Sequence, residues 1–146
     1  MTILPKQGRG RPRSFDPEKT LDAAMQAYWQ QDPSDVSLNT VCTLAGVSKP
    51  ALYREFGSED RFMRAVLDRY AEQVLSDIFK ILSRGHSTKE TFGALVHYAS
   101  EDAKMATGCV FFKMRAGKHR LGPDTRERVE EIDRAAVEAF SSFINF

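Results

Sequence analysis

The sequence predicts an all-α chain of about seven helices. Apolar residues recur at three- and four-residue spacing along most of its length, and no useful stretch alternates strictly between apolar and polar residues. Capping residues and glycines fall at the ends of the periodic stretches. Of 146 residues, 42% are hydrophobic and 28% charged, which is enough apolar material for the core of one compact protein.

The first three predicted helices are short and follow one another closely. Each begins at a side chain that can accept hydrogen bonds from free backbone N–H groups, and each ends at a residue that disfavours helix. The predicted boundaries, from the first helix to the third, are Asp16 to Asp32, Ser37 to Gly46, and Ser48 to Gly57. Pro17 and Pro50 lie in first turns, where a missing backbone N–H costs nothing.

The remaining helices are predicted from longer stretches. The fourth is expected to run as one long linking helix over residues 59–83. Ser87 and Glu90 form a capping box at the start of the fifth. The apolar run 109–112 predicts a sixth helix; its length also allows a strand, but no partner strand is visible elsewhere. A seventh helix is predicted to begin at 122–123.

A basic arm precedes the first helix. Residues 1–13 contain four basic residues and no acidic one, whereas the whole chain has a net charge of +1, so the remainder is slightly acidic. This asymmetry argues against a general polycation and favours an arm that contacts nucleic acid. Arg9, Arg11 and Arg13, separated by Gly10 and Pro12, resemble the core of an AT-hook, which suits a narrow minor groove. The alternative is a flexible solubilising tail.

The same sequence disfavours several classes of protein. It has neither a run of about 18 apolar residues for a membrane helix nor the apolar segment of a secretory signal. We therefore expect a cytoplasmic protein without a membrane partner, in which Cys42 and Cys109 are reduced thiols. These cysteines and His86, His97 and His119 lack the spacing of a zinc site or a catalytic motif, so no enzyme, metal or cofactor is predicted. His97 is expected to pack beside the apolar stripe of its helix.

Two of the short helices have the spacing of a helix-turn-helix motif. Residues 37–56 place them around the tight turn Ala45-Gly46-Val47. The second helix of such a motif fits the major groove, where its first residues face base edges and residues one turn further on reach phosphates. The side chains at these positions, together with one at the start of the preceding helix, are Thr40, Ser48, Lys49, Pro50, Ala51, Tyr53 and Arg54. The alternative is that Ser37 and Ser48 only cap helices and that Tyr53 only packs.

Residues 16–70 as a whole resemble the DNA-binding domain of TetR-family transcriptional regulators. The resemblance rests on LDAAMQAYWQ at 21–30, SLNTVCTLAGVSKPALYREFGSEDRF at 37–62 and, above all, AGVSKPALYREFGS at 45–58. The DNA contacts it implies are Thr40, Ser48, Lys49, Pro50, Tyr53 and Arg54. Family members often have a phosphate-binding Lys just after this stretch. Here that position is Glu59, whose charge would repel phosphate, so that contact is not carried over.

The resemblance also implies a division of the chain and a mode of action. The expected parts are a flexible basic arm (1–14), a DNA-binding domain (15–58) and a helical ligand-binding and dimerisation domain (59–146). Such a protein is expected to be a homodimeric repressor on a palindromic operator of double-stranded DNA, released when a small-molecule effector binds the C-terminal helices. Candidates to line the effector pocket are Phe92, Val96, His97, Cys109, Phe111, Phe112 and Met114. Such residues at helical spacing are also typical of a plain core.

Cys109 is a candidate sensor. It follows Gly108 at the start of the sixth predicted helix, in a pair that resembles one seen in a branch of the family. Thiols at helix N-termini react more readily, and Lys113 and Arg115 lie nearby in sequence. The hypothesis is that Cys109 senses oxidants or electrophiles, and the alternative is a small buried apolar residue. Cys42 is expected in the core.

The sequence stops within an apolar pattern at residues 140–146. Because the family's last helices normally build the dimer interface, we expect either a short member or a chain that is truncated or shifted in frame. Phe140, Phe143, Ile144 and Phe146 would expose an apolar surface through which the protein dimerises. Two other functions remain open: a constitutive DNA-binding dimer without an effector, and a helical adaptor that uses the helix-turn-helix for protein contacts.

Overall fold

The computed structural model describes residues 15–101 and 108–144. This part of the chain is helical and contains no strand, which confirms the all-α prediction. The α-helices are α1 (Pro17–Gln30), α2 (Leu38–Ala45), α3 (Lys49–Phe56), α4 (Glu59–Tyr70), α5 (Ser76–Ser83), α6 (Thr88–Glu101), α7 (Val110–Ala116) and α8 (Pro123–Ile144). Short 3-10 turns, not predicted from the sequence, lie between α1 and α2 at Pro33–Asp35 and between α7 and α8 at Lys118–Arg120. None of the described helices is long and apolar enough to cross a bilayer.

Local capping signals place the helix ends where the sequence predicts them. The Asp16 carboxylate accepts hydrogen bonds from the N–H groups of Glu18 and Lys19 at 3.1 and 3.3 Å, with Pro17 in the first turn. α2 ends at Gly46, whose φ of +68° lies in the left-handed region that glycine adopts without strain. These contacts involve residues close in sequence, which is why the pattern alone could locate them.

The predicted long helix over 59–83 differs from the structure in one respect. A π-helical turn, Ala71–Leu75, separates α4 from α5, although the chain stays helical throughout. The apolar positions Tyr70, Val74, Ile78 and Leu82 repeat every four residues, a longer repeat than the about 3.6 residues of an α-helix. The wider turn, with its i→i+5 hydrogen bonds, keeps these residues on one side of the helix.

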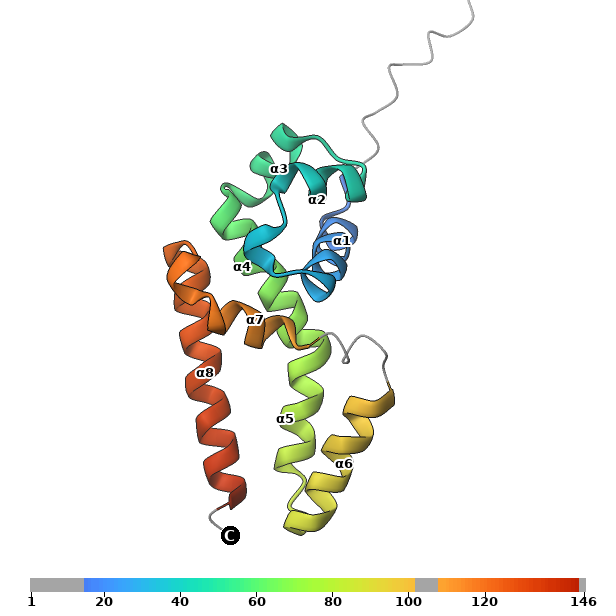
Figure 1. The fold of residues 1–146 in the computed structure, drawn as a ribbon, viewed down its shortest axis with the longest axis vertical. Helices are drawn as coiled ribbons and strands as arrows, with labels where there is room; N and C mark the ends of the chain where they lie inside the picture. The colour runs from blue at the N-terminus through green and yellow to red at the C-terminus, as the bar shows by residue number, and fades with distance from the viewer. Residues whose placement is uncertain (1–14, 102–107, 145–146) are drawn as a thin grey trace, which may run out of the picture.

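Figure 1 shows two parts along the long axis of the molecule. We call α1–α3 the head and α5–α8 the body, and α4 connects them. α8 runs parallel to α4 and α5, α6 returns beside α5, and α7 crosses beneath α1 between head and body. A single hydrophobic core runs through both parts, and a bidentate contact from Arg69 to Asp22, at 2.6 and 3.0 Å, joins α4 to α1.

Asp60, in the first turn of α4, caps the N-terminus of α8. Its carboxylate accepts hydrogen bonds from the N–H groups of Asp124 (2.8 Å) and Thr125 (3.0 Å) and from the buried Thr125 hydroxyl (2.7 Å). A Cβ atom on Gly122 would overlap this carboxyl group, so the close approach requires glycine there. Burial opposes ionisation of Asp60, but the hydrogen bonds from Thr125 and Asp124 outweigh it and hold the pKa of Asp60 below its ordinary value.

Replacing this cap should destabilise the protein in a pH-dependent way. Asp60→Ala is expected to lower the free energy of unfolding by about 1–2 kcal/mol near neutral pH, because α8 and the Thr125 hydroxyl lose their acceptor. Since the folded-state pKa is lowered, this stabilisation is complete above the unfolded pKa of about 4 and is lost as the pH falls through the folded value. Urea unfolding at several pH values measures the difference, with the exposed Asp35→Ala as control. A difference that persists unchanged in acid would contradict this account.

Candidate DNA-binding surface and effector cavity

α3, the second helix of the predicted helix-turn-helix motif, presents most of its length to solvent. Leu52 is its only fully buried side chain and fixes the helix on the core of the head. The residues of this helix and its cap that are predicted to contact DNA are exposed or half-buried: Ser48, Lys49, Pro50, Ala51, Tyr53 and Arg54. They carry a hydroxyl, a phenol and two cations, and α3 itself lies at the end of the molecule away from α5, α6 and α8 (Figure 1). Such a surface suits base edges and phosphates.

The serines of this motif act as helix caps. Ser37 Oγ accepts a hydrogen bond from the Thr40 N–H at 3.1 Å, and Ser48 Oγ accepts one from the Ala51 N–H at 3.2 Å. Thr40 is exposed at the start of α2, and its hydroxyl lies 2.8 Å from that of Ser37. Capping is therefore present, and DNA contact by these residues stays a prediction. The arm residues Arg9, Arg11 and Arg13 lie outside the described residues.

An apolar cavity of about 240 Å³ lies between α5, α6, α7 and α8. Its lining, which carries no charged side chain among the described residues, consists of Leu75, Ile78, Phe79, Leu95, Tyr98, Ala99, Cys109, Phe111, Phe112, Ile132, Ala136 and Phe140. A dry cavity of about 150 Å³ already admits benzene in another protein, so this volume suits a molecule of one or two rings. The lining favours a small, neutral and largely apolar ligand.

Three of the seven residues predicted to line a pocket do so: Cys109, Phe111 and Phe112. Phe92 instead packs edge-on against Phe143 at 5.6 Å, Val96 is 67% exposed, and Met114 belongs to the core. The residues of α6 that line the cavity are Leu95, Tyr98 and Ala99. They lie on a different side of the helix from the predicted Phe92, Val96 and His97. Leu95 and Ala99 belong to the same run of apolar residues, at three- and four-residue spacing, as Phe92 and Val96. Only the packing of the neighbouring helices decides which of these residues face the cavity.

Two further expectations need correction. His97 does not pack beside the apolar stripe; its ring is exposed and its Nε2 lies 2.9 Å from Glu101 Oε1. The i,i+4 spacing of this pair was the sequence signal that could have indicated a solvated helix face. Phe143, expected at an exposed terminus, is buried, whereas Phe140 and Ile144 are exposed as predicted. Phe146 lies outside the described residues.

Cys109 lies at the N-cap of α7 and contributes to the wall of the apolar cavity. Its sulfur is 2.7 Å from the hydroxyl of Tyr70. Burial, reinforced by Cys109, raises the pKa of Tyr70, so the phenol stays protonated and can donate to the sulfur. The two cations that lie near the thiol in sequence have other partners: Lys113 contacts the end of α1, and Arg115 Nε lies 2.7 Å from Asp133. Sensing by Cys109 stays a prediction, and Cys42 lies in the core as expected.

A second hollow, an open groove of about 620 Å³ between α4, the π turn and α8, has different chemistry. Most of its charged residues are already paired with one another. Arg128 Nε lies 2.6 Å from Asp68 Oδ1, and Arg128 Nη1 lies 3.1 Å from Glu131 Oε2. We therefore take the apolar cavity, and not this groove, as the candidate effector site. No group of three potential metal ligands gathers in residues 15–101 and 108–144.

Comparison with known proteins connects this architecture to one family. Residues 21–66 match the family model described as bacterial regulatory proteins, tetR family. The chain is 33% identical over 104 residues to the HTH-type transcriptional repressor ComR of Escherichia coli K12, which covers 59% of this chain and 50% of ComR. It is 31% identical over 61 residues to the uncharacterized HTH-type transcriptional regulator Rv1255c of Mycobacterium tuberculosis, covering 42% and 30% of the two chains.

A solved structure shares the overall fold. The reduced form of NemR from Escherichia coli superposes with a TM-score of 0.67 over 88% of this chain and 69% of NemR, at 19% sequence identity. At that identity the likeness establishes the fold alone. The match spans half the length of ComR and 30% of Rv1255c. It therefore does not assign the function of either whole protein to this chain.

The cavity should bind small neutral aromatic molecules in preference to charged ones. Toluene at about ten times its dissociation constant is expected to stabilise the fold by about 1.4 kcal/mol and raise the melting temperature by about 3–5 °C. Benzoate should give no shift, because its carboxylate would be buried without a partner. Ala136→Phe, which fills the cavity from α8, is the matched variant, and differential scanning fluorimetry is the measurement. An equal toluene shift in the filled variant would show that the ligand binds elsewhere.

Proposed function

We propose that this chain, whose residues 21–66 match the model of the tetR family of bacterial regulatory proteins, is a transcriptional repressor of that family. In this proposal a homodimer binds a palindromic operator through its DNA-binding domain, residues 15–58. It releases the operator when a small molecule binds inside the helical domain, residues 59–146. The observation that carries the proposal is the exposed first turn of α3, which begins with Lys49, together with the exposed Arg54 one turn further on. The family is one of regulators, and regulation is proposed here in place of catalysis.

The DNA contacts divide by role. Ser48, Lys49, Pro50 and Ala51 at the start of α3 are proposed to face base edges, and Tyr53 and Arg54 to bind phosphate, with Thr40 on a neighbouring phosphate. The carboxylate of Glu59 adjoins this surface and limits the contact in that direction. The arm residues Arg9, Arg11 and Arg13 are proposed to enter the flanking minor groove and to increase affinity and salt dependence more than sequence choice.

A dimer is proposed because one helix-turn-helix reads too few base pairs to specify an operator. α8 offers a surface for a second copy. Val137, Phe140 and Ile144 lie on one face of this helix and are 61%, 38% and 67% exposed. Contiguous exposed apolar side chains of this kind mark interaction surfaces.

The apolar cavity favours an effector-responsive regulator over a constitutive one. It is lined by side chains of four helices that converge on a space large enough for a small molecule. A protein whose body only dimerises would gain stability by filling that space with side chains. The adaptor alternative predicts no operator at all and is decided by the first experiment below.

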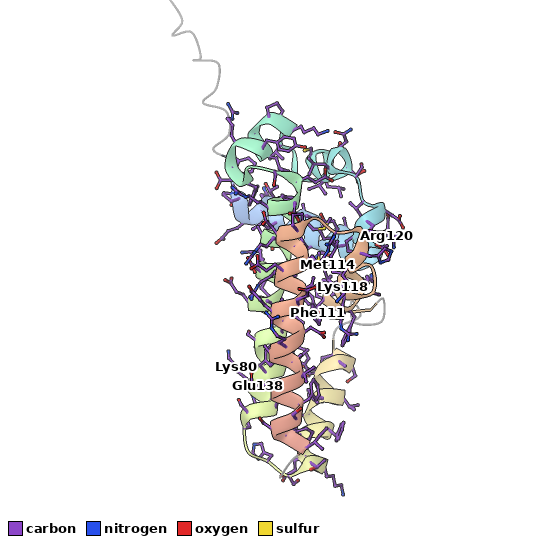
Figure 2. The ribbon with its side chains drawn as sticks, turned by 90° about the vertical axis from the view of Figure 1, so that its left-hand side faces the viewer. Lys80, Phe111, Met114, Lys118, Arg120 and Glu138 are labelled. Atoms are coloured by element: carbon purple, nitrogen blue, oxygen red, sulfur yellow. The ribbon has the colours of Figure 1, made fainter. Side chains whose placement is uncertain are left out.

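Selection of bound sequences from a random pool of double-stranded DNA should recover a palindromic site. On that site, Lys49→Ala is expected to weaken binding by about 1–3 kcal/mol and to relax the sequence preference at the base that Lys49 faces, as for one lost base contact. Tyr53→Phe should weaken binding by about 0.5–1.5 kcal/mol, the contribution of one hydrogen bond. Lys80→Ala, on α5 far from the head (Figure 2), is the control and should bind normally. Recovery of no enriched site, or equal weakening by Lys80→Ala, would refute DNA recognition by α3.

Sedimentation equilibrium should detect a dimer at micromolar protein concentration. Introducing charge on the exposed face of α8 with Val137→Glu and Ile144→Glu is expected to shift the protein to monomer, because a carboxylate cannot be buried unpaired in the interface. Glu138→Gln, beside this face, is the matched control and should stay dimeric. A monomeric wild-type protein would rule out this interface.

A further inference from the structure

One side of α7 belongs to the apolar cavity. Cys109 at its N-cap and Phe111 and Phe112 in its first turn all line that space. A ligand that fills the cavity therefore contacts α7 directly. Figure 2 shows Phe111 and Met114 of this helix at mid-height in the molecule, close to the level at which the head meets the body.

Another side chain of α7 binds the end of α1 in the head. The Lys113 ammonium donates hydrogen bonds to the backbone carbonyl oxygens of Trp29 and, at 3.3 Å, of Tyr28. The last carbonyls of an α-helix have no partner within the helix and favour a positive charge. α1 has no basic residue in its own last turn, so Lys113, 84 positions along the chain from Trp29, supplies this charge.

A second contact leads from the cavity wall to the same turn of α1. The Cys109 sulfur lies 2.7 Å from the Tyr70 hydroxyl, and the Tyr70 ring packs edge-on against the Trp29 ring with 5.3 Å between their centroids. Tyr70 is fully buried and cannot swing away without opening the core. Tyr70 therefore keeps its place when Cys109 moves, and Lys113 remains the contact through which α7 acts on the end of α1.

The opposite end of α1 contacts the recognition helix. α1 has 14 residues and is therefore about 21 Å long. Phe15, just before its N-cap, packs edge-on against Phe56, the last residue of α3, with 6.2 Å between ring centroids. α1 thus contacts α7 of the cavity wall at its C-terminus and α3 at its N-terminus. A shift of the C-terminus of α1 therefore also moves Phe15, against which the last residue of α3 packs.

Other polar links between head and body do not lead to the cavity. Arg120 reaches Asp32 at 3.4 Å, but both side chains are substantially exposed, and water screens such pairs. The Asp60 cap holds α8 to α4 and lies outside the cavity lining. Of these polar contacts, the one made by Lys113 is therefore the one that a change in the cavity would affect most directly.

We propose that α7 couples the cavity to the head, with Lys113 as the positioning residue that transmits its movement to α1. A ligand displaces Cys109 and Phe112, α7 shifts, the hold of Lys113 on the end of α1 changes, and operator affinity falls. Lys113 lines neither the cavity nor the DNA-binding surface. The effect on DNA rests on the proposed function, but the effect on α1 can be measured without DNA.

The test uses Ala136→Leu and Ala136→Phe, which fill the cavity from α8 in two steps and require no ligand. Trp29 is the only tryptophan of the chain, so its fluorescence reports the end of α1. The two variants are expected to change Trp29 emission progressively, and Ala136→Phe to lower affinity for the selected operator about fivefold or more. When Lys113→Met is added, Ala136→Phe should change operator affinity by less than about twofold and largely lose its effect on Trp29.

Two controls separate coupling from general damage. Lys118→Met removes a lysine of the same segment that pairs with Glu130 at 3.8 Å, and it should leave the response to Ala136→Phe intact. Lys113→Arg keeps a cation at the end of α1 and should restore the response. If Lys113→Met does not fold by circular dichroism, Lys113→Gln takes its place.

The outcomes are distinct. A full response to Ala136→Phe in the Lys113→Met background, or no change in Trp29 emission in the wild-type background, overturns the coupling. A Trp29 response that depends on Lys113 supports it even when selection recovers no operator, and in that case it is the proposed function that fails.

Discussion

Burial of α4 is the constraint on which both parts of the molecule depend. Phe62, Val66, Leu67 and Tyr70 are all completely buried. At about 1.5–3 kcal/mol for each large apolar side chain, they contribute about 6–12 kcal/mol of hydrophobic stabilisation, comparable to the whole net stability of a typical domain. Because α1, α7 and α8 all pack on this helix, none can move far without exposing part of it. The head and body therefore share one core, and a change in one part reaches the other.

The polar contacts around α4 and α8 have a different role. Arg128 with Asp68, and Arg64 with Glu127, are half-exposed pairs that contribute little net stability. They do fix which residue of α8 lies beside which residue of α4, since both run parallel and an offset of one turn would break every pair at once. The apolar cavity lies on the other side of Ile132 from these charges. α8 thus keeps a fixed position toward α4 while its apolar side faces a space that a ligand can fill.

The sequence was informative where the determining contacts are local. Helices begin after Asp16 and Ser48 and end at Gly46, and each of these ends is fixed by hydrogen bonds between residues at most four or five positions apart. The helix ends therefore followed from residue type alone. The recognition-helix surface was predictable for the same reason, because a short capped helix with one apolar anchor leaves its other side chains outside. The motif at 45–58 then indicated the family whose model matches residues 21–66.

Features that depend on residues far apart in the chain were not predictable. The inward edge of α6 is decided by where α5 and α8 lie, so Tyr98 was missed and Phe92 and Val96 were wrongly placed in the wall. Lys113 is close to Cys109 in sequence, but that spacing does not indicate the direction of its side chain. The carbonyls that its ammonium binds lie in the first helix of the fold, and only tertiary structure brings them together.

The π turn between α4 and α5 sets the rotational phase of the body relative to the head. It accommodates one residue more than an uninterrupted α-helix would place between Tyr70 and Ser76, and one residue corresponds to a rotation of about 100° about the helix axis. Leu75, Ile78 and Phe79 owe their inward orientation to this extra residue. A single insertion or deletion here would turn a different set of side chains toward the apolar cavity while leaving the exposed side chains of α3 unchanged. The chemistry of the cavity and the surface of the helix-turn-helix can therefore change independently of each other.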